Sequence, residues 1–139
     1  MFNMKWLIVI TALFITSCAF GVIRLNDADN GRKLELREGQ EIVVSLESNP
    51  TTGYIWEISN IGDGIIAQVG KTTYESKSDL LGAGGIQVFR FKAKGAGQVD
   101  LNFVYHRPWE KNVKPVRTFS LKITVNGREQ HNSLKFRKG

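Results

Sequence analysis

Apolar and polar residues alternate along the chain from position 33 onward, with the period of two that is typical of β-strands rather than helices. Four segments show this alternation clearly. Their apolar sets are Ile42, Val44 and Leu46; Tyr54, Trp56 and Ile58; Val99, Leu101, Phe103 and Tyr105; and Phe119, Leu121, Ile123 and Val125. Because successive side chains of a strand point to opposite faces, each set predicts a strand with one buried face.

A fifth segment, residues 86–93, changes phase partway along. Ile86 and Val88 share one phase, whereas Phe89, Phe91 and Ala93 share the other. One extra residue in a strand shifts the phase of its side chains in this way. We therefore expect a β-bulge near Val88.

Clusters of turn-forming residues separate these segments. They are Glu38-Gly39, Asn49-Pro50, Gly62-Asp63-Gly64, Gly82 to Gly85, Gly95-Ala96-Gly97, Pro108 to Pro115 and Asn126-Gly127. About seven to eight short strands at this spacing predict an all-β sandwich, because a single sheet would leave its apolar face in water. An immunoglobulin-like β-sandwich is the usual solution, although the disulfide and the tyrosine corner of antibody domains are not evident.

The first 17 residues have the pattern of a cleaved signal segment. Lys5 precedes a run from Trp6 to Ile15 that is apolar except for Thr11 and is short for a membrane span. The alternative, a buried N-terminal strand or helix, is disfavoured because nothing downstream would pair with so apolar a run. The chain is therefore expected to be exported: to the periplasm or a membrane anchor in a bacterium, otherwise to the secreted space or endomembrane lumen.

Two processing routes fit the end of this segment. Ile15-Thr16-Ser17-Cys18 resembles a bacterial lipobox, in which the peptidase cuts before a lipid-bearing cysteine, so Cys18 is a candidate lipidation site. The small residues Ser17-Cys18-Ala19 also suit ordinary cleavage. A lipid on Cys18 would be the protein's only link to a membrane.

Length and composition predict a single domain followed by a tail. The chain has 139 residues, enough for one core, and the strand pattern lies within residues 22–126. Residues 127–139 are polar and basic, and we expect a flexible tail there. Because Cys18 is the only cysteine, the mature domain has neither an internal disulfide nor a thiolate metal site.

The net charge of +6 falls to about +5 once Lys5 is removed with the signal segment. A basic surface of this size favours an acidic partner, or it simply belongs to a soluble basic protein. Nucleic-acid binding is not predicted, because no helix, arginine-rich stripe or interleaved aromatic patch supports it.

The first loop of interest is Asn49-Pro50-Thr51-Thr52-Gly53-Tyr54. Proline fixes φ, asparagine favours a turn and glycine permits positive φ, so the loop should be stiff and narrow at its tip. Such a tip can enter a narrow cleft with little loss of entropy. Taken alone, such a segment is more often a plain turn than a binding loop.

The second loop is Gly82-Ala83-Gly84-Gly85, where the near-absence of side chains lets another backbone approach closely. A phosphate-binding loop is excluded, because neither the Lys-Ser/Thr pair nor a helix follows, and taken alone the segment is best interpreted as a flexible hairpin loop. The third loop is His106-Arg107-Pro108-Trp109-Glu110, and tryptophan and arginine often dominate binding energy at interfaces. Trp109 either reaches a partner or folds back onto the sandwich.

Together these loops resemble the chagasin family of cysteine-protease inhibitors. The resemblance runs from about Leu36 to Val125, and its three motifs occur in the family's order with strand-like spacers between them. They are Asn-Pro-Thr-Thr-Gly-Tyr-Ile-Trp (49–56), Gly-Ala-Gly-Gly-Ile-Gln-Val-Phe-Arg-Phe-Lys-Ala (82–93) and Gly-Gln-Val-Asp-Leu-Asn-Phe-Val-Tyr-His-Arg-Pro-Trp-Glu (97–110). The family's immunoglobulin-like fold agrees with the strand pattern.

The resemblance implies a monomer that inhibits papain-like, cathepsin L-type proteases by reversible occlusion of the active-site cleft. It further implies a wedge of three loops, the threonine loop entering the cleft and the other two flanking it. The protease-binding residues expected are Asn49, Pro50, Thr51, Thr52, Gly53, Tyr54, Gly82, Ala83, Gly84, Gly85, Arg107, Pro108 and Trp109. The charged segment after Trp109, with Lys111 and Lys114, is expected to influence which protease is preferred.

Catalysis by the chain itself is not expected, and neither is a cofactor. His106 and His131 are the only histidines, and no serine elbow or metal-ligand spacing accompanies them. The remaining alternative is a non-inhibitory, exported β-sandwich, such as an envelope lipoprotein that binds a glycan or a protein. That alternative leaves the order of the three motifs unexplained.

Overall fold

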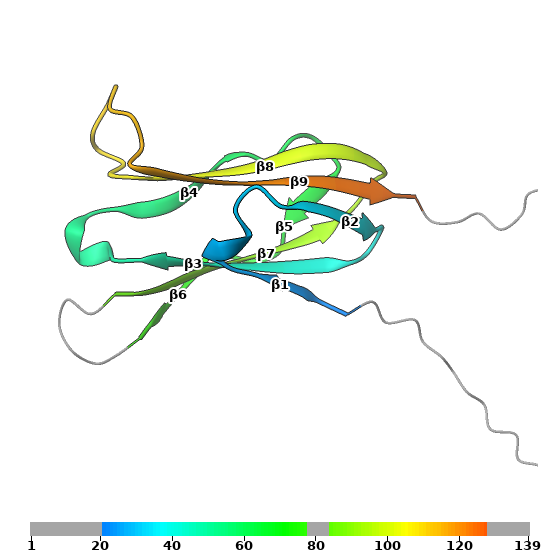
Figure 1. Ribbon diagram of the computed structural model, residues 1–139, viewed down its shortest axis with the longest axis horizontal. Coiled ribbons are helices and arrows are strands. Elements are labelled where there is room, and N and C mark those ends of the chain that lie inside the picture. The colour runs from blue at the N-terminus through cyan, green and yellow to red at the C-terminus, as the bar shows by residue number, and fades with distance from the viewer. Residues whose placement is uncertain (1–20, 78–83, 128–139) are drawn as a thin grey trace, which may run out of the picture.

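Two β-sheets packed face to face form the body of the protein (Figure 1). The computed structural model describes residues 21–77 and 84–127. Nine strands lie in this part of the chain: β1 (Ile23–Leu25), β2 (Lys33–Arg37), β3 (Glu41–Ser48), β4 (Ile55–Asn60), β5 (Ile66–Gln68), β6 (Thr73–Ser76), β7 (Gly85–Ala93), β8 (Gly97–His106) and β9 (Arg117–Asn126). Two short 3-10 turns, η1 (Asp27–Asp29) and η2 (Pro50–Thr52), interrupt the connections.

One sheet has the order β1-β3-β7-β5, with β6 also paired to β7, and the other has the order β2-β9-β8-β4. Most pairs are antiparallel, but β1 runs parallel to β3 and β2 runs parallel to β9. The all-β, immunoglobulin-like sandwich is confirmed. The strand total exceeds the expected one because β1 and β5, three residues each, are too short to show an alternating pattern.

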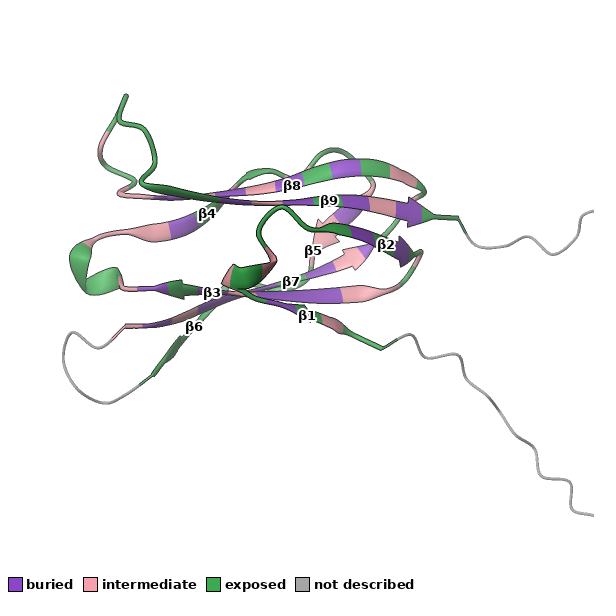
Figure 2. Ribbon diagram, viewed as in Figure 1, coloured by how far each residue is buried: buried purple, intermediate pink, exposed green. Residues whose placement is uncertain are grey.

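The core lies between the sheets and is built from the alternating apolar sets (Figure 2). Four phenylalanines meet at its centre. Phe103 of β8 lies edge-on to Phe89 at 4.8 Å and to Phe119 at 5.8 Å between ring centroids. The contact of Phe103 with Phe89 joins the two sheets across the core, and the contact with Phe119 joins neighbouring strands of one sheet. Aromatic pairs favour this edge-to-face geometry.

The expected bulge near Val88 is wrong. Strand β7 pairs with β3 in an unbroken register from Glu41↔Lys92 to Ser48↔Gly85. The phase break has a different cause: Gln87 takes the inward position that the pattern predicts to be apolar, and it is buried there. Val88 is buried on the opposite face of the strand, opposite Ser45.

The described chain begins at Gly21 and ends at Gly127, both at the same end of the sandwich, at the right in Figure 1. The loop between β3 and β4 and the loop between β8 and β9 lie at the other end. The expected signal segment, Cys18, the basic tail beyond Gly127, and the loop residues Gly82 and Ala83 fall outside the described residues. No helix in residues 21–77 or 84–127 is long and apolar enough to cross a membrane.

Candidate functional site

The loop from Asn49 to Tyr54, here called the threonine loop, crosses from one sheet to the other. It leaves β3 and enters β4, which belongs to the opposite sheet. Its centre is the 3-10 turn η2, in which Pro50 supplies a fixed φ at the first turn position. The Asn49 side chain caps this turn by accepting a hydrogen bond from the Thr51 backbone N–H at 3.2 Å.

Both threonine hydroxyls bond within the loop. Thr51 donates to the Asn49 side-chain oxygen at 2.6 Å, and Thr52 donates to the Asn49 carbonyl at 2.7 Å. The Gly53 N–H donates to the Pro50 carbonyl at 2.9 Å and closes the turn with φ +88°, a left-handed conformation that suits glycine. Pro50, Thr51 and Thr52 are nevertheless exposed, so the tip is rigid and accessible at once.

A buried amide fixes the base of the threonine loop. Gln87 of β7 reaches across to the other sheet, where its Oε1 accepts from the Trp56 N–H at 2.7 Å and its Nε2 donates to the Trp56 carbonyl at 3.1 Å. The same Oε1 accepts from the Ser48 hydroxyl at 2.8 Å. Trp56 adds a second link by donating its indole N–H to the Glu47 carbonyl at 2.8 Å.

Gln87 joins both strands that carry the threonine loop, because Ser48 ends β3 and Trp56 lies in β4. This role of Gln87 is not predicted by the sequence pattern. The signal in the sequence is a lone polar residue in phase with Phe89 and Phe91, where the pattern predicts a bulge. A buried amide with satisfied partners is an alternative explanation for such a break.

Tyr105 supports the loop from β8. Its hydroxyl accepts a hydrogen bond from the Asn49 N–H at 2.9 Å, at the first residue of the loop. Its ring stacks on Tyr54 at 5.5 Å and lies 5.0 Å from the ring of Trp56. Both ends of the threonine loop therefore rest on one aromatic side chain.

Arg107, at the start of the loop between β8 and β9, is engaged within the protein. Its Nε donates to the Thr52 carbonyl at 3.1 Å, and its guanidinium lies 4.4 Å from the centre of the Tyr54 ring. One of its terminal nitrogens donates to Glu110 at 3.3 Å. These contacts tie two loops of the expected wedge to each other, and they leave the guanidinium only partly exposed.

Trp109 neither folds into the sandwich nor stands clear of the protein. It is 65% exposed, the largest exposed fraction among the large apolar side chains of the described residues. One edge of its six-membered ring lies against Gly53, where a β-carbon would overlap Cη2 and come within 3.0 Å of Cζ2. The exposed indole is thus positioned by the threonine loop.

Of the second loop, Gly84 and Gly85 are described. A β-carbon on Gly84 would lie 3.2 Å from the Ser48 carbonyl and 3.9 Å from Cβ of Asn49, so this glycine sits beside the root of the threonine loop. Gly85 is buried, and a β-carbon there would overlap the Glu75 carbonyl. The structure therefore brings the described parts of all three loops to one end of the sandwich.

A hollow of about 280 Å³ lies at the root of the threonine loop and is lined there by Gly84, Ser48 and Asn49, among others. Lys77 lies on its rim and donates to Glu47 at 2.8 Å. This hydrogen bond and the ammonium charge lower the pKa of the Glu47 carboxyl, and the same contact raises the pKa of Lys77. Arg117, also on the rim, pairs with Asp27 at 3.1 Å, so both cations have a carboxylate partner.

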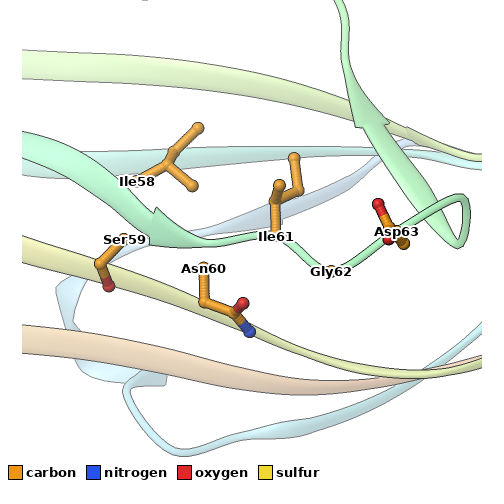
Figure 3. A pocket seen from close by; sticks show the side chains of 6 residues that line it. All are labelled: Ile58, Ser59, Asn60, Ile61, Gly62 and Asp63. Carbon is orange, nitrogen blue, oxygen red and sulfur yellow. The ribbon is translucent and has the colours of Figure 1, made fainter.

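A larger hollow, about 600 Å³, lies along the end of β4 and the turn that follows it (Figure 3). It is lined by the consecutive residues Ile58 to Asp63. Binding sites usually gather polar groups from several elements, and this one draws on a single segment. In the described ranges, no group of three or more His, Cys, Asp or Glu side chains could hold a metal ion.

Comparison with known proteins identifies a matching family and several relatives. The family described as "Chagasin family peptidase inhibitor I42" matches residues 35–123. Chagasin from Trypanosoma cruzi is 32% identical, over 74% of this chain and 97% of its own length. Amoebiasin-1 from Entamoeba histolytica is 29% identical, over 73% of this chain and 97% of its own length.

Solved structures give the same assignment of fold. A cysteine protease inhibitor from Entamoeba histolytica superposes with a TM-score of 0.68 at 24% identity, over 76% of this chain and 96% of its own. A similarity of this extent supports the shared fold.

Proposed function

The chain belongs to the chagasin family of peptidase inhibitors, and from this premise we propose that it inhibits papain-like cysteine proteases by plugging their active-site cleft. The family consists of inhibitors rather than enzymes. The cysteine protease inhibitor from Entamoeba histolytica, which shares the fold, supports the class of partner. One inhibitor monomer binds one protease.

The strongest support is the contact between Gly53 and Trp109, because it makes two expected binding loops into one surface. The threonine loop is the central element, since it is narrow and exposed and its hydroxyls are already hydrogen-bonded. A loop that is ordered before binding loses little conformational entropy in the complex. Most of the free energy of its contacts with the protease therefore contributes to affinity, because little is offset by ordering the loop.

The turn also explains how the loop resists cleavage. The backbone of η2 is curled, with hydrogen bonds from the Thr52 and Gly53 amides to the carbonyls of Asn49 and Pro50. Hydrolysis requires a peptide carbonyl held close to the nucleophile and aligned with it. A curled loop offers no carbonyl in that extended geometry, so the complex is non-covalent and reversible.

The flanking loops widen the contact on either side of the cleft. Gly82 to Gly85 allows the protease backbone to approach closely, and Pro108 with Trp109 covers the opposite wall. An interface of this kind is expected to bury about 1,600 Å² in total. Arg107 contributes mainly by holding Thr52 and Tyr54 in place, because its guanidinium is already bonded inside the inhibitor.

Titration of papain and of a cathepsin L-type protease with the purified protein tests the proposal. We expect stoichiometric loss of activity against a peptide substrate, full recovery on dilution, and an intact inhibitor chain by mass spectrometry. Absence of inhibition of both enzymes at micromolar concentration would overturn it. The non-inhibitory binding module would then be the better account.

A further inference from the structure

The most exposed large apolar side chains of the described residues all lie in the loop between β8 and β9. They are Trp109 at 65%, Val113 at 57% and Val116 at 56%. The proposed wedge uses Trp109 but neither valine. We call residues 111–116, which follow the wedge, the distal arm.

The distal arm is a defined projection at the wedge end of the sandwich (Figures 1 and 2). The Glu110 N–H donates to the Arg107 carbonyl at 3.0 Å, and the Val116 N–H donates to the Tyr105 carbonyl at 3.0 Å, which closes the base of the loop. Asn112 turns the chain with φ +62°, a conformation that asparagine tolerates better than most residues. The arm thus has a fixed base and a tight turn.

The charge of the distal arm is positive. Lys111 and Lys114 are exposed, and neither makes an ion pair with a carboxylate in the part of the chain that the structure describes. The nearest acidic residue in sequence, Glu110, already pairs with Arg107 at 3.3 Å. Two exposed valines, Val113 and Val116, therefore alternate along the arm with two lysines that carry uncompensated charge.

Apolar side chains surrounded by charge are typical of protein interfaces, with an apolar centre and a polar rim. The arm continues directly from Trp109, so a protease seated on the wedge would also face the arm. Six residues span at most about 20 Å when extended, and the arm reaches less than this because it turns at Asn112 and both its ends are held at the base. The arm can therefore contact only the surface next to the cleft.

We propose that the distal arm is a second, charge-selective contact, which binds an apolar patch edged by carboxylates on the protease surface beside the cleft. The inference rests on the proposed function and adds to it a reason for preferring acidic proteases. The lysines accelerate association with a negative surface, and the valines slow dissociation once the surfaces meet.

The test compares two double variants that change net charge equally. Lys111→Glu/Lys114→Glu reverses the charge of the arm, and Lys33→Glu/Lys94→Glu reverses two exposed lysines that belong neither to the arm nor to the three loops of the wedge. Association rates of the full-length chains are measured with two papain-like proteases, one of acidic and one of basic isoelectric point. With the acidic protease we expect the arm variant to associate about tenfold more slowly at low salt, and the difference to shrink at high salt.

With the acidic protease, the association rate of the control variant should fall much less than that of the arm variant. With the basic protease, the arm variant should associate no more slowly than the wild type. Val113→Ser/Val116→Ser should leave association unchanged and raise the dissociation rate several-fold. Equal rates for the arm and control variants, with the wild type still inhibiting, would overturn the inference alone. A wild-type chain that inhibits neither protease would overturn the proposed function.

Discussion

The six-membered ring of Trp109 lies against Gly53, so closely that residue 53 has no room for a β-carbon. The two residues are far apart in sequence and belong to loops that leave different strands. Their contact explains why the exposed indole has a defined position, and why a glycine is needed beneath it.

Gly53→Ala should displace Trp109 and weaken protease inhibition at least tenfold. Alanine at φ +88° costs about 1–2 kcal/mol of stability by itself. Gly39→Ala is a matched control, because Gly39 has φ +91° and open space at its β-carbon position. Both variants should lose similar thermal stability, but only Gly53→Ala should change the tryptophan fluorescence and the inhibition constant.

Trp109→Ala should cost about 2 kcal/mol or more of binding free energy, mostly through faster dissociation. Its effect on folding should stay below about 0.5 kcal/mol, because the side chain is largely exposed. Stopped-flow kinetics and thermal melts measure the two quantities. Equal potency of the variant would show that the indole is not part of the interface.

Thr52→Asp should abolish tight inhibition while the protein stays folded. The new carboxylate would enter a desolvated cleft without a partner, which costs several kcal/mol, and it would also face the Asn49 carbonyl that now accepts the Thr52 hydroxyl. Thr52→Asn is the control, because its uncharged amide can donate to that carbonyl. If both variants inhibit equally, the tip does not enter a water-free cleft.

Arg107→Ala should loosen the threonine loop in the free protein. Loss of the bond to the Thr52 carbonyl and of the stacking on Tyr54 should speed amide hydrogen exchange in residues 51–53 at least several-fold. Arg107→Lys should behave like alanine, because lysine has neither the planar group nor the fork of donors. An unchanged exchange rate with weaker inhibition would instead indicate a direct contact with the protease.

The pair of Glu47 and Lys77 should give a pH dependence with a definite sign. Since the pKa of Glu47 is lowered in the folded protein, the pair stabilises the fold above the unfolded-state pKa of the carboxyl and is lost as the pH falls through the folded value. Since the pKa of Lys77 is raised, its contribution is lost at the alkaline end, as the pH rises through the folded value.

Carbon-detected NMR titration of the Glu47 carboxyl measures the first effect. Lys77→Met should return the pKa of Glu47 toward its usual range, because it removes the hydrogen bond and the positive charge together. A titration curve that is identical in the wild type and in Lys77→Met would contradict the assigned cause.

Alternation along the sequence was enough to predict the sandwich and its core. The phase of Val99, Leu101, Phe103 and Tyr105 needs no knowledge of the partner strand, because the side chains of any strand alternate between its faces. The stiffness of the threonine loop could also be predicted, since proline and glycine restrict or extend φ wherever they occur.

Only the tertiary structure decided which residues that are distant in sequence contact one another. The bulge predicted near Val88 was wrong because Gln87 satisfies the backbone of Trp56 on the opposite sheet, a partner that the sequence of β7 does not reveal. The parallel pairing of β2 with β9, the position of Trp109 over Gly53 and the bond from Arg107 to Thr52 are likewise contacts between distant segments. Such contacts depend on the path of the whole chain, whereas periodicity and turn propensity are local properties of a few adjacent residues.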